Sequence, residues 1–123
     1  KSSLPEEIHS FCISLNKKLK ASEGFRKKAL PPLLYRYFTD MGIAFKEVHR
    51  LLKKDKYFCL IVGHNHTMIG GARTDIDTPR LLSYLGKQIG FEIHEIMELE
   101  AYQRYGLNSS NAVQKESLIV FKK

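Results

Sequence analysis

Residues 51–90, LLKKDKYFCLIVGHNHTMIGGARTDIDTPRLLSYLGKQIG, decide the fold of this chain. The uninterrupted apolar run Tyr57–Val62 predicts a strand with both faces covered, as in sheets flanked by helices on either side. A loop over residues 63–74, rich in Gly, His and Thr, follows the strand and leads into a helix that Asp77 or Thr78 can cap. Ligands of open α/β sheets bind at the carboxyl ends of the strands, so we expect function to lie in this loop.

Two helices are predicted before that stretch. The first begins near Pro5, and its apolar residues recur at helical spacing: Ile8, Phe11, Cys12, Leu15 and Leu19. Residues 20–30 break this pattern and contain consecutive basic residues, which predicts a mobile, cationic connection. The second helix is expected from about residue 31 to residue 54, with Pro31 and Pro32 at its start. One face of it is apolar: Leu34, Tyr37, Phe38, Met41, Phe45, Val48 and Leu52.

Two strands are predicted after that stretch. Residues 91–99 mix apolar and charged side chains, which suits the edge of a sheet. Residues 118–121, LIVF, are apolar throughout and indicate an interior strand. Because a crossover helix joins the strands at 57–62 and 91–99, these two should be parallel. The simplest placement puts the last strand between them, antiparallel to its neighbours, which gives an α/β sheet flanked by helices.

Composition and charge favour one soluble domain that binds a polyanion. No apolar run approaches the roughly 18–20 residues needed to span a bilayer, so we expect no membrane partner. Cys12 and Cys59 both lie in apolar surroundings, which predicts reduced core residues and a cytoplasmic protein. The formal net charge is +7, and the excess falls into blocks at residues 17–28 and 46–56. Such a surface favours nucleic acid, although a solvated helix face would have the same composition.

The predicted ending of the chain resembles the C-terminal half of the Rossmann-like S-adenosylmethionine-dependent methyltransferase fold. Residues 45–71, FKEVHRLLKKDKYFCLIVGHNHTMIGG, are similar to a segment of DNA amino-methyltransferases of the N4-cytosine and N6-adenine types and of related RNA enzymes. In that family a helix ending in E-x-x-R-x-L-K precedes a V-x-V-V-G strand. Here Glu47, Arg50, Leu52 and Lys53 occupy the end of the helix, and residues 60–63 close the strand. The tail, IGFEIHEIMEL and ESLIVFKK, also resembles the closing strands of the family.

The resemblance implies that residues 1–123 are a single partial methyltransferase domain. Residues 1–30 would form a helix plus a basic connection, and residues 31–123 a helix–strand–loop–helix–strand–strand unit. The family's Gly-rich cofactor loop, acidic ribose-binding residue and Asp/Ser/Asn-Pro-Pro-Tyr/Phe tetrapeptide are not in this sequence. The family's Gly-Gly turn is replaced by Asp55-Lys56. The expected partner is therefore the missing N-terminal half of the fold, which would bind S-adenosylmethionine, and no catalytic residue is predicted in this chain.

The predicted functional residues fall into two groups. By analogy with the family, the loop would border the pocket that receives an extruded base, through Gly63, His64, Asn65, His66, Thr67 and Arg73. The predicted nucleic-acid contacts are Arg26, Lys27, Lys28 and Arg36, with Arg104 beside tyrosines that could stack on bases. A glycine-rich connection and a solvated surface are the structural alternatives. The His-x-His pair has no nearby third ligand, so no metal site is predicted.

The expected function is that of the C-terminal part of a DNA methyltransferase, which transfers a methyl group to an exocyclic amino group of a base. Two alternatives remain open. The chain could be a non-catalytic nucleic-acid- or protein-binding module with a degenerate methyltransferase-like fold, or a fragment of an RNA methyltransferase.

Overall fold

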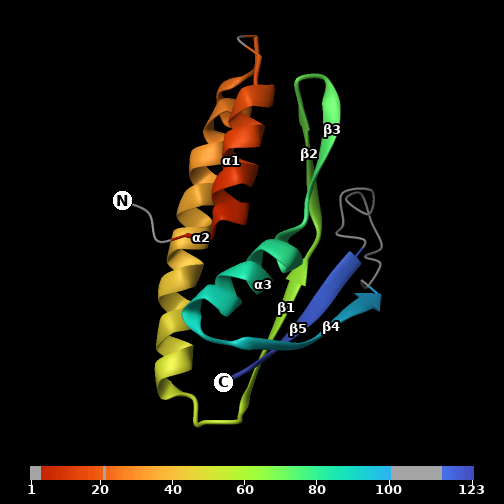
Figure 1. The fold of residues 1–123 in the computed structure, drawn as a ribbon. Coiled ribbons are helices and arrows are strands. Elements are labelled where there is room, and N and C mark those ends of the chain that lie inside the picture. Colours follow the sequence, from red (N-terminus) through yellow and green to blue (C-terminus); the bar gives the residue numbers. More distant parts are fainter. Residues whose placement is uncertain (1–3, 21, 101–114) are drawn as a thin grey trace.

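The computed structural model describes residues 4–20, 22–100 and 115–123. Its helices gather on one side of a small sheet, and a β-hairpin extends from the sheet alongside them (Figure 1). The helices are α1 (Glu6–Lys18), α2 (Phe25–Leu51) and α3 (Thr78–Ile89), and the strands are β1 (Tyr57–Gly63), β2 (Asn65–Ile69), β3 (Ala72–Ile76), β4 (Glu92–Glu100) and β5 (Lys115–Lys122). Among the described residues, no helix is long and apolar enough to cross a membrane.

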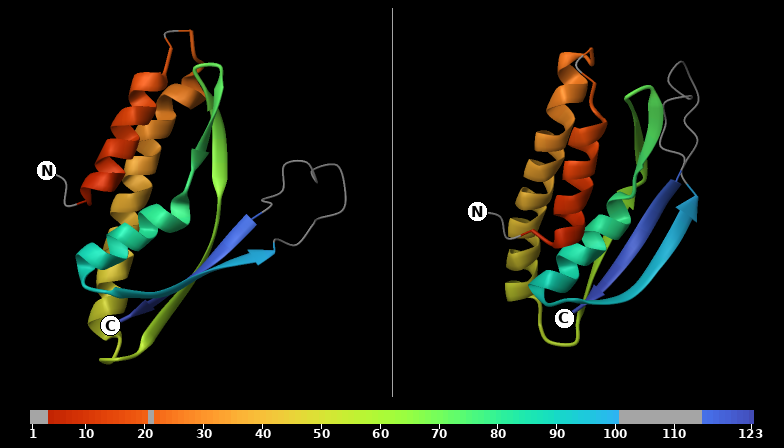
Figure 2. Two further views of the ribbon diagram at one scale, coloured as in Figure 1. Left: turned by 45° about the vertical axis from the view of Figure 1, so that its right-hand side comes forward. Right: turned by 45° about the horizontal axis from the view of Figure 1, so that its top comes forward.

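The main sheet has the order β1-β5-β4, with the last strand in the middle (Figure 2). This order confirms the prediction from the sequence. Both pairings are antiparallel, with Phe121 of β5 opposite Phe58 of β1 and Ile93 of β4. β1 and β4 therefore run in the same direction, but no two neighbouring strands among the described residues are parallel. The described fold is mixed α/β with an antiparallel sheet, and a parallel Rossmann-like sheet is not seen in it.

A cluster of aromatic rings joins the sheet to the helices. Phe121 is fully buried, and its ring stacks on Phe58 with a centroid distance of 5.4 Å. Phe45 of α2 and Phe91, just after α3, pack against the same ring at 5.3 and 5.4 Å. Burial of each such side chain contributes about 1.5–3 kcal/mol relative to exposure. The cluster therefore holds α2 and the end of α3 against one face of β1 and β5.

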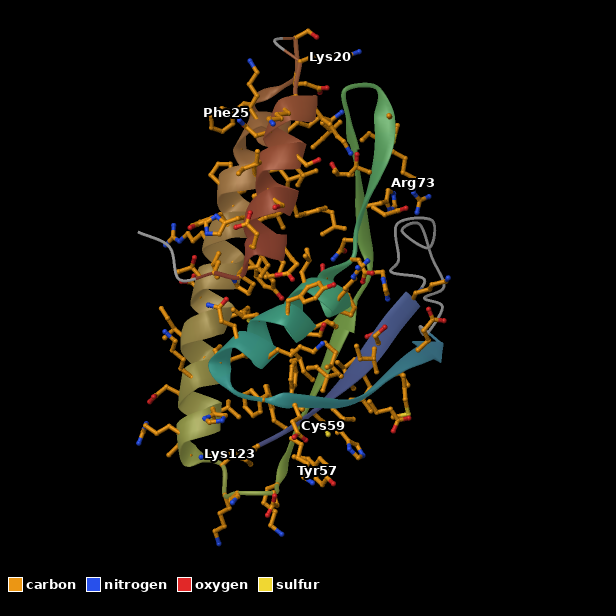
Figure 3. All side chains as sticks on the ribbon, in the orientation of Figure 1. Lys20, Phe25, Tyr57, Cys59, Arg73 and Lys123 are labelled. Carbon is orange, nitrogen blue, oxygen red and sulfur yellow. The ribbon has the colours of Figure 1, made fainter. Side chains whose placement is uncertain are left out.

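β1 is covered on one face only, contrary to the prediction of two covered faces. Phe58 and Leu60 pack against the hydrophobic core, whereas Tyr57 and Ile61 are 48% and 57% exposed. Cys59 is likewise exposed, so the prediction that it is a core residue is wrong (Figure 3). The physical reason is that all the described helices lie on the same side of the sheet. Cys12 is buried, as predicted.

The segment predicted as a loop over residues 63–74 is a β-hairpin. β2 and β3 pair antiparallel, with Thr67 opposite Thr74. The turn is Gly70-Gly71, with φ angles of 63° and 80°, and such positive values suit the tight hairpin turns that favour glycine. Apolar and β-branched side chains alternate along both strands, and the buried ones are Ile69, Thr74 and Ile76.

α2 begins at Phe25 and ends at Leu51, instead of running from about residue 31 to 54. Residues 25–30 are therefore helical, and the prediction of a mobile connection up to residue 30 is wrong. Arg, Lys, Ala and Leu in this segment are strong helix formers, which extends the helix N-terminal to Pro31 and Pro32. α1 and α3 lie where the sequence predicted them.

Candidate nucleic-acid interface

His64 lies where three elements meet, directly after β1. Its backbone N–H donates to the carbonyl oxygen of Lys115, at 3.1 Å, and so continues the pairing of β1 with β5. Its Nε2 is 3.0 Å from the hydroxyl of Ser117 in β5. Its Nδ1 is 3.6 Å from Oδ1 of Asp77, and the same carboxylate caps α3 by accepting from the N–H of Arg80 at 3.3 Å. The imidazole thus connects β1, β5 and the start of α3.

The series Ser117, His64 and Asp77 has the residue types of a hydrolytic triad, but the geometry does not suit a nucleophile. Ser117 is only 2% exposed, in the middle strand of the sheet, so a substrate carbonyl cannot reach its hydroxyl. Asp77 already serves as the helix cap. We therefore assign this group a structural role, which is to fix the base of the hairpin against α3.

The hairpin has a packed face and an exposed face. Ile69 and Ile76 are 1% and 5% exposed and pack toward the helices. On the opposite face His66 lies across from Asp75, and Met68 lies across from Arg73. Arg73 donates from Nε to Oδ1 of Asp75 at 3.0 Å, and Arg73 projects away from the helices (Figure 3). The exposed face therefore offers to solvent an imidazole, a thioether and a guanidinium that is paired with a carboxylate.

The six predicted pocket residues lie in different parts of the structure and do not line one pocket. Gly63 ends β1, and His64 is held between β5 and α3. His66 and Arg73 share the exposed face of the hairpin, whereas Thr67 is half-buried on the packed face. Asn65, at the start of β2, is exposed. His66 and Arg73 are thus the two that lie together with side chains available to a ligand.

The tip of the hairpin is attached to the connection between α1 and α2. The N–H of Gly70 donates to Oε1 of Glu23 at 2.6 Å. A Cβ on Gly70 would lie 2.6 Å from the carbonyl oxygen of Lys18, so the two backbones approach closely. Oε2 of Glu23 is also 3.7 Å from Nζ of Lys27 in α2. These contacts bring the hairpin tip beside the most basic part of the chain, as the two views in Figure 2 show.

We call this basic part the cationic end, and its exposed basic residues are Lys17, Lys18, Lys20, Arg26, Lys27 and Lys28. Phe25 lies among them and is 87% exposed, and Figure 3 shows it with Lys20 at the end of the two helices. Phe25 is not among the residues predicted from the sequence, although a Phe directly before three basic residues is a recognisable signal. Aromatic rings exposed beside cationic side chains stack on the bases of single-stranded nucleic acids in many proteins.

Two predicted contacts lie elsewhere. Arg36 is ten residues beyond Arg26 on the same helix, which corresponds to about 15 Å along the axis. It therefore lies outside the cationic end. Arg104 and its neighbouring tyrosines fall outside the described residues.

The residues at the end of α2 on which the predicted resemblance rests form a local ion pair. Arg50 donates to both carboxylate oxygens of Glu47, each at 3.0 Å. The pairing lowers the pKa of the Glu47 carboxyl and raises that of the Arg50 guanidinium, through the hydrogen bonds and the opposite charge. Both side chains are exposed, so their contribution to stability is small.

The described residues contain no group of three or more His, Cys, Asp and Glu side chains placed to hold a metal ion. His64 is engaged by Ser117 and Asp77, whereas His66 is exposed opposite Asp75.

No protein-family model matches the chain, and no curated protein or solved structure matches it significantly.

Proposed function

We propose that this chain is the C-terminal part of a site-specific DNA methyltransferase, which transfers a methyl group from S-adenosylmethionine to an exocyclic amino group of a base. The observation that supports the proposal is the position of β5 in the main sheet. The last strand lies between β1 and β4 and runs opposite to both. The sequence resemblance implies this same order, in which a reversed final strand separates two strands of common direction.

The surface chemistry supports a nucleic-acid substrate. The cationic end offers ammonium and guanidinium groups that can neutralise phosphates. The exposed face of the hairpin, which follows β1 in the chain, presents His66 and Arg73. Phosphate contacts would position the nucleic acid, and the hairpin side chains would contact a base.

The residues of this chain do not fit the methyl donor. Asp77, whose carboxylate lies beside His64 just after β1, already caps α3. The family's cofactor-binding motifs are also not in the sequence. We therefore assign binding of S-adenosylmethionine and the transfer step to the N-terminal half of the fold, and assign contact with the nucleic acid to this chain.

The test is to produce this chain together with the coding segment immediately upstream of it and to assay methyl transfer. With tritiated S-adenosylmethionine, the combined protein should label duplex DNA more than tRNA, and calorimetry on this chain alone should detect no binding of the donor. Labelling of tRNA in preference to DNA would support the RNA enzyme instead. Failure of the combined protein to bind the donor would refute the methyltransferase proposal.

The second candidate is a non-catalytic nucleic-acid-binding module, which the cationic end with Phe25 favours. Fluorescence anisotropy with a labelled DNA duplex tests the interface directly. Each phosphate contact contributes about 0.9 to the slope of log K against log salt, so the triple variant R26A/K27A/K28A should lower the slope by about 3. The matched control is K53A/K54A/K56A, which removes the same charge from the turn before β1. An equal decrease of the slope in both variants would show that binding depends on net charge and not on the cationic end.

A further inference from the structure

Phe25 is the most exposed large hydrophobic side chain in the described part of the chain, at 87%. It is the first residue of α2, and Figure 3 shows it on the side of that helix away from the hairpin. A single exposed apolar residue is common on protein surfaces. It indicates a binding site only where its neighbours suit the same ligand.

Cationic side chains surround this ring. Arg26, Lys27 and Lys28 follow it directly and are exposed. Four consecutive helical residues rise by only about 4.5 Å along the axis and turn through about 300°, so the three cations lie around the helix at the level of the ring. α1 ends where α2 begins (Figure 1), so the other members of the cationic end lie at the same end of the molecule.

The acidic residue of this segment is turned away from an approaching anion. Residues 17–28 contain six basic residues and a single acidic one, Glu23. The Glu23 side chain is only 11% exposed, and its carboxylate accepts from the N–H of Gly70 and pairs with Lys27. The carboxylate thus faces the hairpin, whereas the cations face solvent. A phosphate that approaches this surface therefore meets positive charge.

We propose that the cationic end binds single-stranded nucleic acid, with an unpaired base stacked on the ring of Phe25 and the flanking phosphates paired with the surrounding cations. The inference rests on the contact with nucleic acid that the proposed function assigns to this chain, and it names the form of nucleic acid that this surface takes. A phenyl ring has no hydrogen-bonding group that could recognise the edge of a base, so it contributes by stacking. The bases of a duplex are already stacked on one another, and insertion of a ring between them costs unstacking energy that a single strand does not require.

The basic segment before β1 lacks this arrangement. Tyr57 is the aromatic residue that follows the basic residues 53, 54 and 56, and its ring already has neighbours. It packs at an angle against His94, with a centroid distance of 5.1 Å, and Nζ of Lys122 lies 5.9 Å from its centroid. A base would therefore find a largely uncovered ring at the cationic end and a partly covered one before β1.

Cations beside an exposed aromatic residue also suit an anionic membrane surface, but the apolar area here is small. A helix that lies on a membrane buries a continuous apolar face in the lipid. Leu33 is the next exposed large apolar residue along α2 after Phe25, and it lies about 12 Å further along the axis. An isolated ring among cations matches a base between phosphates more closely, and binding to lipid is one of the outcomes of the test.

Fluorescence anisotropy compares a labelled oligothymidylate, which forms no duplex, with a DNA duplex of the same length. The chain should bind the single strand more tightly at the same salt concentration. Phe25→Ala should weaken binding of the single strand by about 5- to 150-fold, the usual effect of removing one stacking partner. The slope of log K against log salt should not change, because no phosphate contact is lost. An abasic strand of the same length should bind the unaltered chain as weakly as oligothymidylate binds the variant.

The matched control is Leu51→Ala. Leu51 is 70% exposed at the other end of the same helix, and Lys53 and Lys54 follow it closely, so it shares the exposure and the charged surroundings of Phe25 without the ring. Leu51→Ala should bind the single strand as the unaltered chain does. An equal loss of affinity in the two variants would contradict stacking on Phe25.

A tryptophan at position 25 reports the contact directly, because the sequence contains no tryptophan. A base stacked on the indole of Phe25→Trp should quench its emission, whereas insertion into lipid would shift the emission to shorter wavelength. Oligothymidylate should therefore quench the emission, and the abasic strand and vesicles of phosphatidylserine and phosphatidylcholine should leave it unchanged. Leu51→Trp should not be quenched. A shift with the vesicles and no quenching by the single strand would overturn the inference in favour of a membrane.

The outcomes separate this inference from the proposed function. Methyl transfer by the combined protein, with equal affinity of Phe25→Ala and the unaltered chain for the single strand, would overturn the stacking site and leave the methyltransferase proposal intact. Stacking at position 25 without methyl transfer would support the site, refute the methyltransferase and favour the nucleic-acid-binding module. Binding of the duplex as tightly as the single strand, or no binding of the single strand, would also overturn the inference.

Discussion

Replacement of Gly86 by Ala tests whether α3 approaches β5 as closely as the structure shows. A Cβ at this position would lie 2.3 Å from Cε1 and 2.7 Å from Cδ1 of Phe121. Non-bonded carbon atoms prefer about 3.5–4.0 Å. The ring cannot turn away freely, because it is fully buried and packs against Phe45, Phe58 and Phe91. The helix must therefore move away from the strand, or the aromatic cluster must repack.

Two effects of opposite sign decide the result. Ala is more favourable than Gly in a helix interior by about 0.8–1.0 kcal/mol. Overpacking of a core costs about 1–3 kcal/mol and occasionally more. A contact this short against a constrained ring lies at the upper end of that range, so the clash outweighs the helix propensity. We expect Gly86→Ala to lose about 1–2 kcal/mol of unfolding free energy, or about 4–8 °C in Tm for a domain of this size.

Gly42 in α2 provides the matched control. It is also a buried helical glycine, but a Cβ there would meet its nearest atom, Cδ1 of Leu85, at 3.5 Å, an ordinary contact. Gly42→Ala should therefore gain a few tenths to about 1 kcal/mol from helix propensity. Urea denaturation followed by circular dichroism measures both variants. Equal stabilisation of the two would refute the close packing of α3 on Phe121.

Three further outcomes follow from the hairpin, the helix cap and the thiols. Gly70→Ala should destabilise the chain more than Gly71→Ala in urea denaturation, because both glycines have positive φ but only Gly70 would meet a backbone oxygen at 2.6 Å. Asp77→Ala should cost about 0.5–2 kcal/mol through loss of the cap of α3, whereas Asp77→Asn should retain most of it; an equal loss in the two would contradict the capping role. Ellman's reagent should modify Cys59 rapidly and Cys12 slowly, because burial raises the pKa of the Cys12 thiol and so lowers its thiolate fraction near neutral pH.

Much of the fold could be predicted because its signals are local. Pro5 with two acidic residues marks the start of α1, and Asp77 with Pro79 marks that of α3. The strand order followed from a contrast between two strands. The final strand is apolar, which placed it inside the sheet, and the strand before it is charged, which placed that strand at an edge. These patterns depend on burial, which the hydrophobic effect determines in the same way in any fold.

The hairpin and the start of α2 were not predicted, for physical reasons that lie in tertiary context. Gly70-Gly71 fits a tight turn, but the flanking strands are short and partly polar, so a loop was equally consistent with the sequence. The contact of Glu23 with Gly70 joins segments that are 47 residues apart in the chain, and no local pattern indicates it. As a result, the predicted pocket residues were identified, but their separation onto two faces of a hairpin was not.

The wrong prediction for β1 shows where an apolar sequence and the burial of a strand part company. A run such as YFCLIV is typical of a strand buried on both faces, and exposure of Tyr57, Cys59 and Ile61 costs hydrophobic free energy that an alternating sequence would avoid. β4 shows that this chain does place charges on a strand that faces solvent. The apolar sequence of β1 is therefore accounted for by strand propensity as well as by burial, because aromatic and β-branched residues favour strands even where one face is exposed.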